Sequence, residues 1–268
     1  MDLESLALQA TGSEVAFLVL LAFVPPVIFV VWIRNTEKYG REPWSKIVGT
    51  FLWGAIFAVL IGAILETILI LPFAVSGPLD QFIARRFGDP STFALLLVAL
   101  VIAPFVEEFT KAWGVLRRAF VIREPEDGFV YGATSGFGFS ATENLMYGLI
   151  TLFLPGGGFG ASLLQIAIRS ISSTLLHGSA TSVTGYGIAR HRLWGPRFSA
   201  FPWYIGAVAM HSAFNAIAVL GSILADPSQL GDAGLLIVLG AAVVFSVVSI
   251  SVVRGKIMEQ EGRQSWVP

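Results

Sequence analysis

The residues best suited to chemistry are two adjacent carboxylates with a lysine one helical turn further on, inside an apolar stretch. Glu107, Glu108 and Lys111 lie between Ser91 and Leu116. On a helix each glutamate is three or four residues from the lysine, so the ammonium can neutralise one of them. Burying a carboxylate at the centre of a bilayer costs about 2.5–3.5 kcal/mol even on the lowest scale. We therefore expect these side chains to face a polar interior.

Polar groups of the same kind occur in three later apolar segments: Glu143, His177, and His211 with Asn215. His211 and Asn215 are four residues apart, which places them on one face of a helix. Neutral imidazole is the commonest metal ligand, and two imidazoles with a carboxylate form a known catalytic zinc set. The sequence has no His-Glu-x-x-His motif, so a conventional zincin is excluded. The pattern indicates a functional site within the membrane.

Composition places the chain in a lipid bilayer. Of its 268 residues, 55% are hydrophobic and 13% charged, and the mean hydropathy is +0.75. A soluble domain carries about 25% charged residues. Seven stretches are long enough to cross a hydrocarbon layer about 30 Å thick. They are Val15–Ile33, Ile47–Val75, Ser91–Leu116, Gly128–Phe153, Ala161–Ala189, Phe201–Leu224 and Ala233–Val253. We predict an all-α polytopic membrane helix bundle of about seven transmembrane helices.

The distribution of Lys and Arg predicts the orientation. Thirteen of them fall in alternate loops and the C-terminal tail, against only Arg85 and Arg86 on the other side; Lys111 and Arg169 lie within spans. Cytoplasmic loops are the ones enriched in these residues. We expect a multi-pass protein of the cell (plasma or inner) membrane with its N-terminus outside and its C-terminus cytoplasmic. One membrane domain is expected over residues 1–268, with the catalytic helices within about 91–221.

Two segments show how the site could be positioned. Gly128, Gly132 and Gly136 recur every four residues in the segment that carries Glu143. Small residues at this spacing let membrane helices pack closely. The next segment has a hydroxyl stripe around His177, at the spacing of one helix face. The stripe consists of Ser170, Thr174, Thr181 and Thr184. Such a stripe is expected to face protein or water.

Taken in order, these motifs resemble those of the PrsW-type intramembrane proteases. The matching segments are Glu107-Glu108-Phe109-Thr110-Lys111, Phe139 to Asn144 with Glu143, the surroundings of His177, and His211 to Asn215. The cytoplasmic segments Tyr39 to Trp44 and Glu124 to Gly128 resemble loops of the same family. The resemblance covers about Lys38 to Leu220. The family is similar, more distantly, to the CAAX prenyl proteases, which have histidine where this chain has Glu143.

The resemblance implies hydrolysis of a peptide bond within or near the membrane by a water that a glutamate activates, with a metal as a possible cofactor. It also implies a membrane-anchored protein substrate, in this family an anti-sigma factor, and no nucleic acid. We expect Glu107 or Glu108 to be the general base and the other to hold Lys111 or a ligand. His177, His211 and Glu143 are the expected ligands of a divalent metal, with zinc preferred. Asn215 is expected to orient His211 or to donate to the oxyanion.

Three alternatives stay open at this level. A metal-free enzyme would use the histidines themselves to stabilise the oxyanion. A proton or divalent-cation transporter or channel would use the same buried Glu/His cluster as a relay. A non-catalytic scaffold would use these groups only for helix contacts. The enzyme is preferred because the polar groups differ in kind and come from four separate helices.

Overall fold

The computed structural model describes all residues except 1–10, 38–39, 75–77, 88, 225–231 and 265–268. Every regular element in the described part of the chain is helical. In chain order the elements are α2 (Gly12–Asn35), α3 (Trp44–Leu52), the π-helix η1 (Trp53–Ala58), α4 (Val59–Ala74), α5 (Pro78–Phe87), α6 (Pro90–Leu97), the π-helix η2 (Val98–Ile102), α7 (Ala103–Leu116), α8 (Pro125–Phe153), α9 (Phe159–Trp194), α10 (Phe201–Leu224) and α11 (Asp232–Gln264). This confirms the predicted all-α class.

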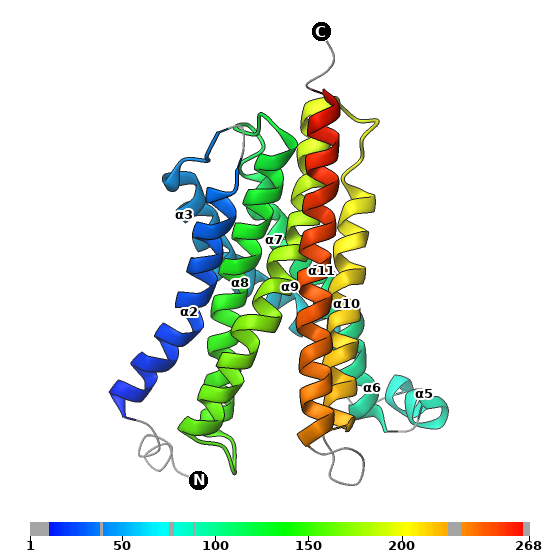
Figure 1. Ribbon diagram of the computed structural model, residues 1–268. Coiled ribbons are helices and arrows are strands. Elements are labelled where there is room, and N and C mark those ends of the chain that lie inside the picture. Colours follow the sequence, from blue (N-terminus) through cyan, green and yellow to red (C-terminus); the bar gives the residue numbers. More distant parts are fainter. Residues whose placement is uncertain (1–10, 38–39, 75–77, 88, 225–231, 265–268) are drawn as a thin grey trace.

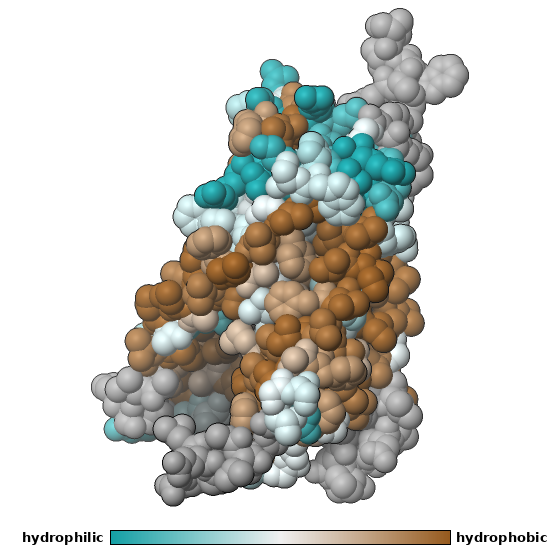
Figure 2. All heavy atoms as spheres, turned by 90° about the vertical axis from the view of Figure 1, so that its left-hand side faces the viewer, coloured by the Kyte–Doolittle hydropathy of each residue, from teal (hydrophilic) through white to brown (hydrophobic). Residues whose placement is uncertain are grey.

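Helices long and apolar enough to cross a membrane make this a multi-pass membrane protein. Within the described residues five qualify: Gly12–Asn35, Trp44–Phe73, Pro90–Leu116, Phe159–Trp194 and Phe201–Gly221. The outer face of the bundle is apolar over its middle and lower part and hydrophilic at its upper end (Figure 2). The other two predicted spans correspond to α8 and α11. The count of seven and the orientation remain predictions.

The helix α8 lies inside the bundle, which explains why it can be less apolar than its neighbours. It packs against α2, α3, η1, α7 and above all α9 (Figure 1). Most of its first seventeen residues are buried. A helix that is covered by protein on all sides does not need an apolar surface toward lipid, so small and polar residues are tolerated along it.

The predicted glycine ridge forms the contact between α8 and α9. A Cβ atom on Gly128, Gly132 or Gly136 would overlap a backbone carbonyl oxygen of α9, namely that of Gly185, Thr181 or His177. The two backbones therefore touch where the glycines leave room. This confirms the packing role of the ridge. It also fixes the backbone of His177 against α8.

We predict that Gly136→Ala destabilises the protein, because the added methyl group must push His177 and α9 away from α8. Overpacking of this kind costs about 1–3 kcal/mol, which corresponds to a fall in Tm of roughly 2–10 °C. Thermal unfolding in detergent measures it. The matched control is Gly240→Ala in α11, where nothing lies within 4 Å of the added Cβ. An unchanged Tm in Gly136→Ala would contradict the close packing.

Candidate active site

The structure brings the predicted site residues of four helices together. α7 carries Glu107, Glu108 and Lys111, and α8 carries Glu143; α9 and α10 supply the two histidines. The side chains on α7 and both histidines are buried, and Glu143 is partly buried. These ionisable groups point into the bundle and not toward lipid, as the sequence predicts.

Lys111 lies at the centre of this cluster. Its ammonium donates to Glu107 Oε2 at 3.1 Å, to Glu108 Oε1 at 2.9 Å and to His177 Nδ1 at 2.7 Å. It also lies 4.2 Å from the centre of the Phe139 ring. An ammonium has three hydrogen atoms to donate, so all of its donors are used. Lys111 is thereby fully satisfied although it is fully buried.

The two adjacent glutamates have different surroundings. Glu108 accepts from Lys111, from His211 Nδ1 at 3.1 Å and from Thr181 Oγ1 at 2.9 Å, so both of its oxygens are engaged. Glu107 accepts a single side-chain hydrogen bond, from Lys111, within the described part of the chain. Adjacent helical residues project about 100° apart, which explains the difference. Glu107 is the carboxylate that remains available for other chemistry.

The hydrogen bonds of His177 define which of its ring nitrogens faces the site. Lys111 can only donate, so the Nδ1 atom of His177 must accept. The Nε2 atom then carries the hydrogen and donates to Glu143 Oε2 at 2.8 Å. Glu143 is in turn paired with Arg169, whose Nη2 atom lies 2.7 Å from the same Oε2 atom. The lone pair of Nδ1 therefore points toward Lys111 and Glu107.

His211 is held in the same manner by the other glutamate. Its Nδ1 atom donates to Glu108 Oε1. Its Nε2 atom then keeps a lone pair and lies 3.8 Å from Glu107 Oε2, while Nδ1 of His177 is 3.9 Å from that oxygen. The two imidazole rings are perpendicular, with centroids 4.8 Å apart. Both histidines turn toward Glu107 the ring nitrogen that no carboxylate holds, and in His177 this nitrogen accepts from Lys111.

Asn215 lies in a different place from the one the sequence led us to expect. Its amide nitrogen donates to the carbonyl oxygen of Ala99 at 2.7 Å, and not to His211. Ala99 lies in η2, where each carbonyl pairs with the amide five residues on; Ala103 N–H bonds to Val98 in this way. The next donor would be residue 104, which is Pro104 and has no N–H. Asn215 supplies the missing donor and ties α10 to the start of α7.

The donor atoms at the centre fit a divalent metal. One ligand atom each from Glu107, His177 and His211 lies within 4.8 Å of the other two, and all three residues are buried. Two imidazoles and one carboxylate suit zinc. Glu143, predicted as a ligand, is not part of this group but holds the opposite nitrogen of His177. Lys111 bonds to the same atoms of Glu107 and His177, so a metal would have to replace it there.

The sequence reasoning gave no role to Arg169, and it singled out Thr181 only as part of the hydroxyl stripe. Arg169 was visible as a charge within a span, which is a signal of function in membrane proteins. Its partner could not be named because Glu143 lies on another helix. Thr181, one helical turn from His177, donates the third hydrogen bond that Glu108 accepts.

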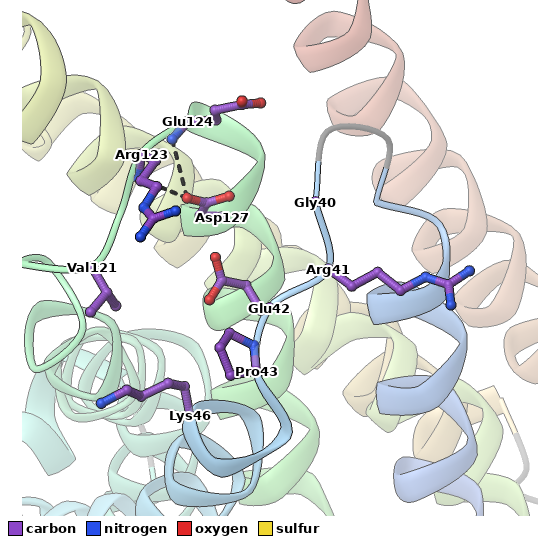
Figure 3. A pocket seen from close by; sticks show the side chains of 9 residues that line it. All are labelled: Gly40, Arg41, Glu42, Pro43, Lys46, Val121, Arg123, Glu124 and Asp127. Atoms are coloured by element: carbon purple, nitrogen blue, oxygen red, sulfur yellow. Dashed lines mark hydrogen bonds between the residues drawn. The ribbon is translucent and has the colours of Figure 1, made fainter.

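A second polar group lies at the end of the bundle predicted to be cytoplasmic. The segments around Glu42 and Asp127 meet there and line a cavity of about 260 Å³. Figure 3 shows Asp127 accepting from the backbone amides of Arg123 and Glu124. Glu42 accepts from Tyr131, and its amide donates to Glu37 at 2.8 Å. Glu37, Glu42 and Asp127 form a second acidic group in the described residues.

Comparison with known proteins agrees with the motifs. A family model described as PrsW family intramembrane metalloprotease matches residues 42–251. The chain is 28% identical over 212 residues to a protein named Protease PrsW from Clostridioides difficile (strain 630), and this match covers 76% of this chain and 79% of that protein. No solved structure matches the chain. The family match spans all four helices of the buried cluster.

We predict that Lys111→Met binds zinc more tightly than the wild-type protein. The metal no longer has to break the hydrogen bonds of the ammonium, each worth about 1.5–3 kcal/mol, so the affinity should rise at least about tenfold. Titration against a chromophoric chelator measures the affinity, and the zinc-induced rise in Tm gives a second readout. Lys46→Met, at the cavity that Glu42 and Asp127 line, is the matched control. Equal or weaker zinc affinity in Lys111→Met would show that the ammonium and the metal do not compete.

The acidic group at the end of the bundle predicts a pH dependence of stability. Burial raises the pKa of Glu37 from its ordinary 4.5 to about 7. The folded state therefore binds this proton more tightly than the unfolded state, so the stabilisation is complete below about pH 4.5 and is lost as the pH rises through about 7.

We expect Tm to fall by roughly 2–4 °C between pH 6 and pH 8, a small effect because Glu37 is only partly buried and solvent screens its charge. Glu37→Gln should flatten this slope, whereas Glu14→Gln, at the exposed start of α2, should keep it. A slope that is the same in all three proteins would argue against titration of Glu37.

Proposed function

The chain belongs to the PrsW family of intramembrane metalloproteases, and from that premise we propose that the buried cluster around Glu107 hydrolyses a peptide bond of a membrane-anchored protein. Family membership also decides between the protease and the transporter that the sequence left open, in favour of the protease. What remains to be proposed is the role of each residue, the metal and the substrate.

One observation supports the arrangement most strongly: two histidines, each held by its own carboxylate, turn their second ring nitrogens toward a third carboxylate. Glu143 holds His177, and Glu108 holds His211. Carboxylate–histidine pairs of this kind orient the ligands of catalytic metal sites. We assign Glu143 and Glu108 to this positioning role. Glu143 is thus proposed as a partner of a ligand, and not as the ligand that the sequence suggested.

Glu107 is proposed as the general base. It removes a proton from a water molecule while the oxygen of that water attacks the scissile carbonyl carbon. After the tetrahedral intermediate forms, Glu107 returns the proton to the departing amine and the carbon–nitrogen bond breaks. Glu107 suits this role because only one hydrogen bond from a described side chain engages it, whereas Glu108 is saturated.

Of the three residues whose atoms could hold a metal, His177 and His211 would bind a divalent ion, for which we propose zinc, and Glu107 would remain to act as the base. The bound ion would supply Lewis acidity that polarises the scissile carbonyl. The residues of the chain orient the ligands and balance the charge. His177 and His211 are kept in one orientation by their carboxylates, and Lys111 balances the negative charge of the paired glutamates. The surrounding helices keep bulk water and lipid out of the cluster.

A membrane-anchored anti-sigma factor is the proposed substrate, on the resemblance of the motifs to this family. The depth of the cluster supports a substrate that is itself in the membrane. Glu107, His177 and His211 lie away from the ends of the membrane-spanning helices Pro90–Leu116, Phe159–Trp194 and Phe201–Gly221. A scissile bond must reach that depth, so the substrate chain must enter from the bilayer or unwind next to it.

The test is cleavage of a single-span anti-sigma factor of the host, reconstituted in liposomes with the protease, with an unrelated single-span protein as the comparison substrate. Glu107→Gln should lower kcat by about 10²–10⁴-fold, the usual contribution of a general base. Glu108→Gln should lower it about 10–100-fold, through His211. Glu14→Gln, outside the cluster, is the control. Cleavage at the wild-type rate by Glu107→Gln would refute its assignment, and equal cleavage of both substrates would refute the proposed specificity.

A further inference from the structure

Arg169 is a cation inside a membrane helix with four partners. It lies on α9, two helical turns before His177. Its Nη2 atom bonds to Glu143 Oε2 at 2.7 Å and to Ser173 Oγ at 3.2 Å, and its Nε atom bonds to Asn144 Oδ1 at 3.0 Å. Its guanidinium also lies 3.9 Å from the centre of the Tyr147 ring. These contacts hold the guanidinium in a single orientation.

The orientation of Arg169 determines which oxygen atom of Glu143 accepts the hydrogen bond from His177. The same Oε2 atom of Glu143 accepts from Arg169 and from His177 Nε2. A carboxylate that is free to rotate could offer either oxygen or turn away. Arg169 prevents this rotation because two further hydrogen bonds hold its planar guanidinium. Its Nε atom donates to Asn144 and its Nη2 atom donates to Ser173. The chain of contacts therefore runs from Arg169 through Glu143 to the ring of His177.

We propose that Arg169 is a positioning residue of the active site, which holds Glu143 so that its Oε2 atom accepts from His177 Nε2 and the imidazole ring keeps Nδ1 turned toward Glu107. The inference extends the function proposed above, but the hydrogen-bond chain on which it rests is independent of cleavage. Within the described part of the chain Arg169 contacts Glu143 and its neighbours, and neither Glu107 nor Lys111. Its effect passes through Glu143.

The contact between α8 and α9 does not depend on this ion pair. The glycine ridge packs the two backbones, and Ser140 Oγ bonds to Thr174 Oγ1 across the same contact at 2.9 Å. The side chains of Arg169 and Glu143 are 18% and 17% exposed, so this pair lies at the edge of the buried cluster. Loss of Arg169 should therefore change His177 more than it changes the fold.

The first experiment reads the ring of His177 directly. The chain has three histidines, so ¹⁵N-histidine labelling gives three imidazole signals, which single substitutions assign. In the wild-type protein His177 should show hydrogen on Nε2 and a lone pair on Nδ1. In Arg169→Gln the hydrogen should stay on Nε2, because Lys111 still donates to Nδ1, but the Nε2–H signal should shift and broaden as its hydrogen bond to Glu143 loosens. Hydrogen on Nδ1 in the wild-type protein, or an unchanged His177 signal in Arg169→Gln, would overturn the proposal, and neither reading requires an active protease.

The second experiment is a double-mutant cycle on cleavage. Arg169→Gln should lower kcat about 10–100-fold, as the loss of such partners usually does, with KM changed less than about twofold. Combined with Glu143→Gln it should add little, because both changes break the same chain. Arg169→Lys, which keeps one bond to Glu143, should restore part of kcat. Independent losses that multiply in the double variant would overturn the proposal.

The matched control is Arg190→Gln. Arg190 is also on α9, but it lies among the rings of Tyr186, Trp194, Phe198 and Trp203 near the other end of the helix. It reports the effect of removing a cation from α9 without touching Glu143. We expect its His177 signal and kcat to stay at the wild-type values. If Arg190→Gln changes both as strongly as Arg169→Gln does, the effect of Arg169 is a general one on α9 and the proposal fails.

Discussion

The structure depends on the burial of one ammonium among two carboxylates and an imidazole. Lys111 is fully buried and bonds to Glu107, Glu108 and His177. Leaving any of these charges without a partner at this depth would cost several kcal/mol. The partners come from α7 and α9, so the bundle can close only when these helices stand in one relative position. The pairing of Lys111 is therefore required both for the fold and for the site.

A second constraint is the orientation of the histidines. An imidazole can rotate and exchange tautomers, but His177 and His211 each give one nitrogen to a carboxylate. Glu108 serves two purposes, because it balances Lys111 and holds His211. The result is a preorganised set of two imidazole nitrogens and one carboxylate, from which a metal would have to displace the ammonium of Lys111.

Backbone geometry, in addition to the charges, positions the helices that carry the site. The π-helix η2 and Pro104 leave the carbonyl of Ala99 without a backbone donor, and Asn215 fills that gap from α10. This bond connects the helix of His211 to the start of the helix of Glu107. On the other side, the glycine ridge sets the distance between α8 and α9, and with it the distance between Glu143 and His177. The carbonyl that η2 leaves without a backbone donor thus helps to align α10 with α7.

The sequence by itself determined the all-α membrane class, the convergence of Glu107, Glu108, Lys111 and the two histidines, and the family. Such features follow from segment length, from hydropathy and from the spacing of residues one turn apart on the same helix. An unpaired charge is costly anywhere in a bilayer, so ionisable side chains within the spans are expected to face the interior of the bundle. Only the tertiary structure decided that Glu143 meets His177 and Arg169, that Thr181 meets Glu108, and that Asn215 meets Ala99. All of these pairs join different helices. Their partners follow from the rotation and spacing of packed helices, which residue spacing along one helix does not fix.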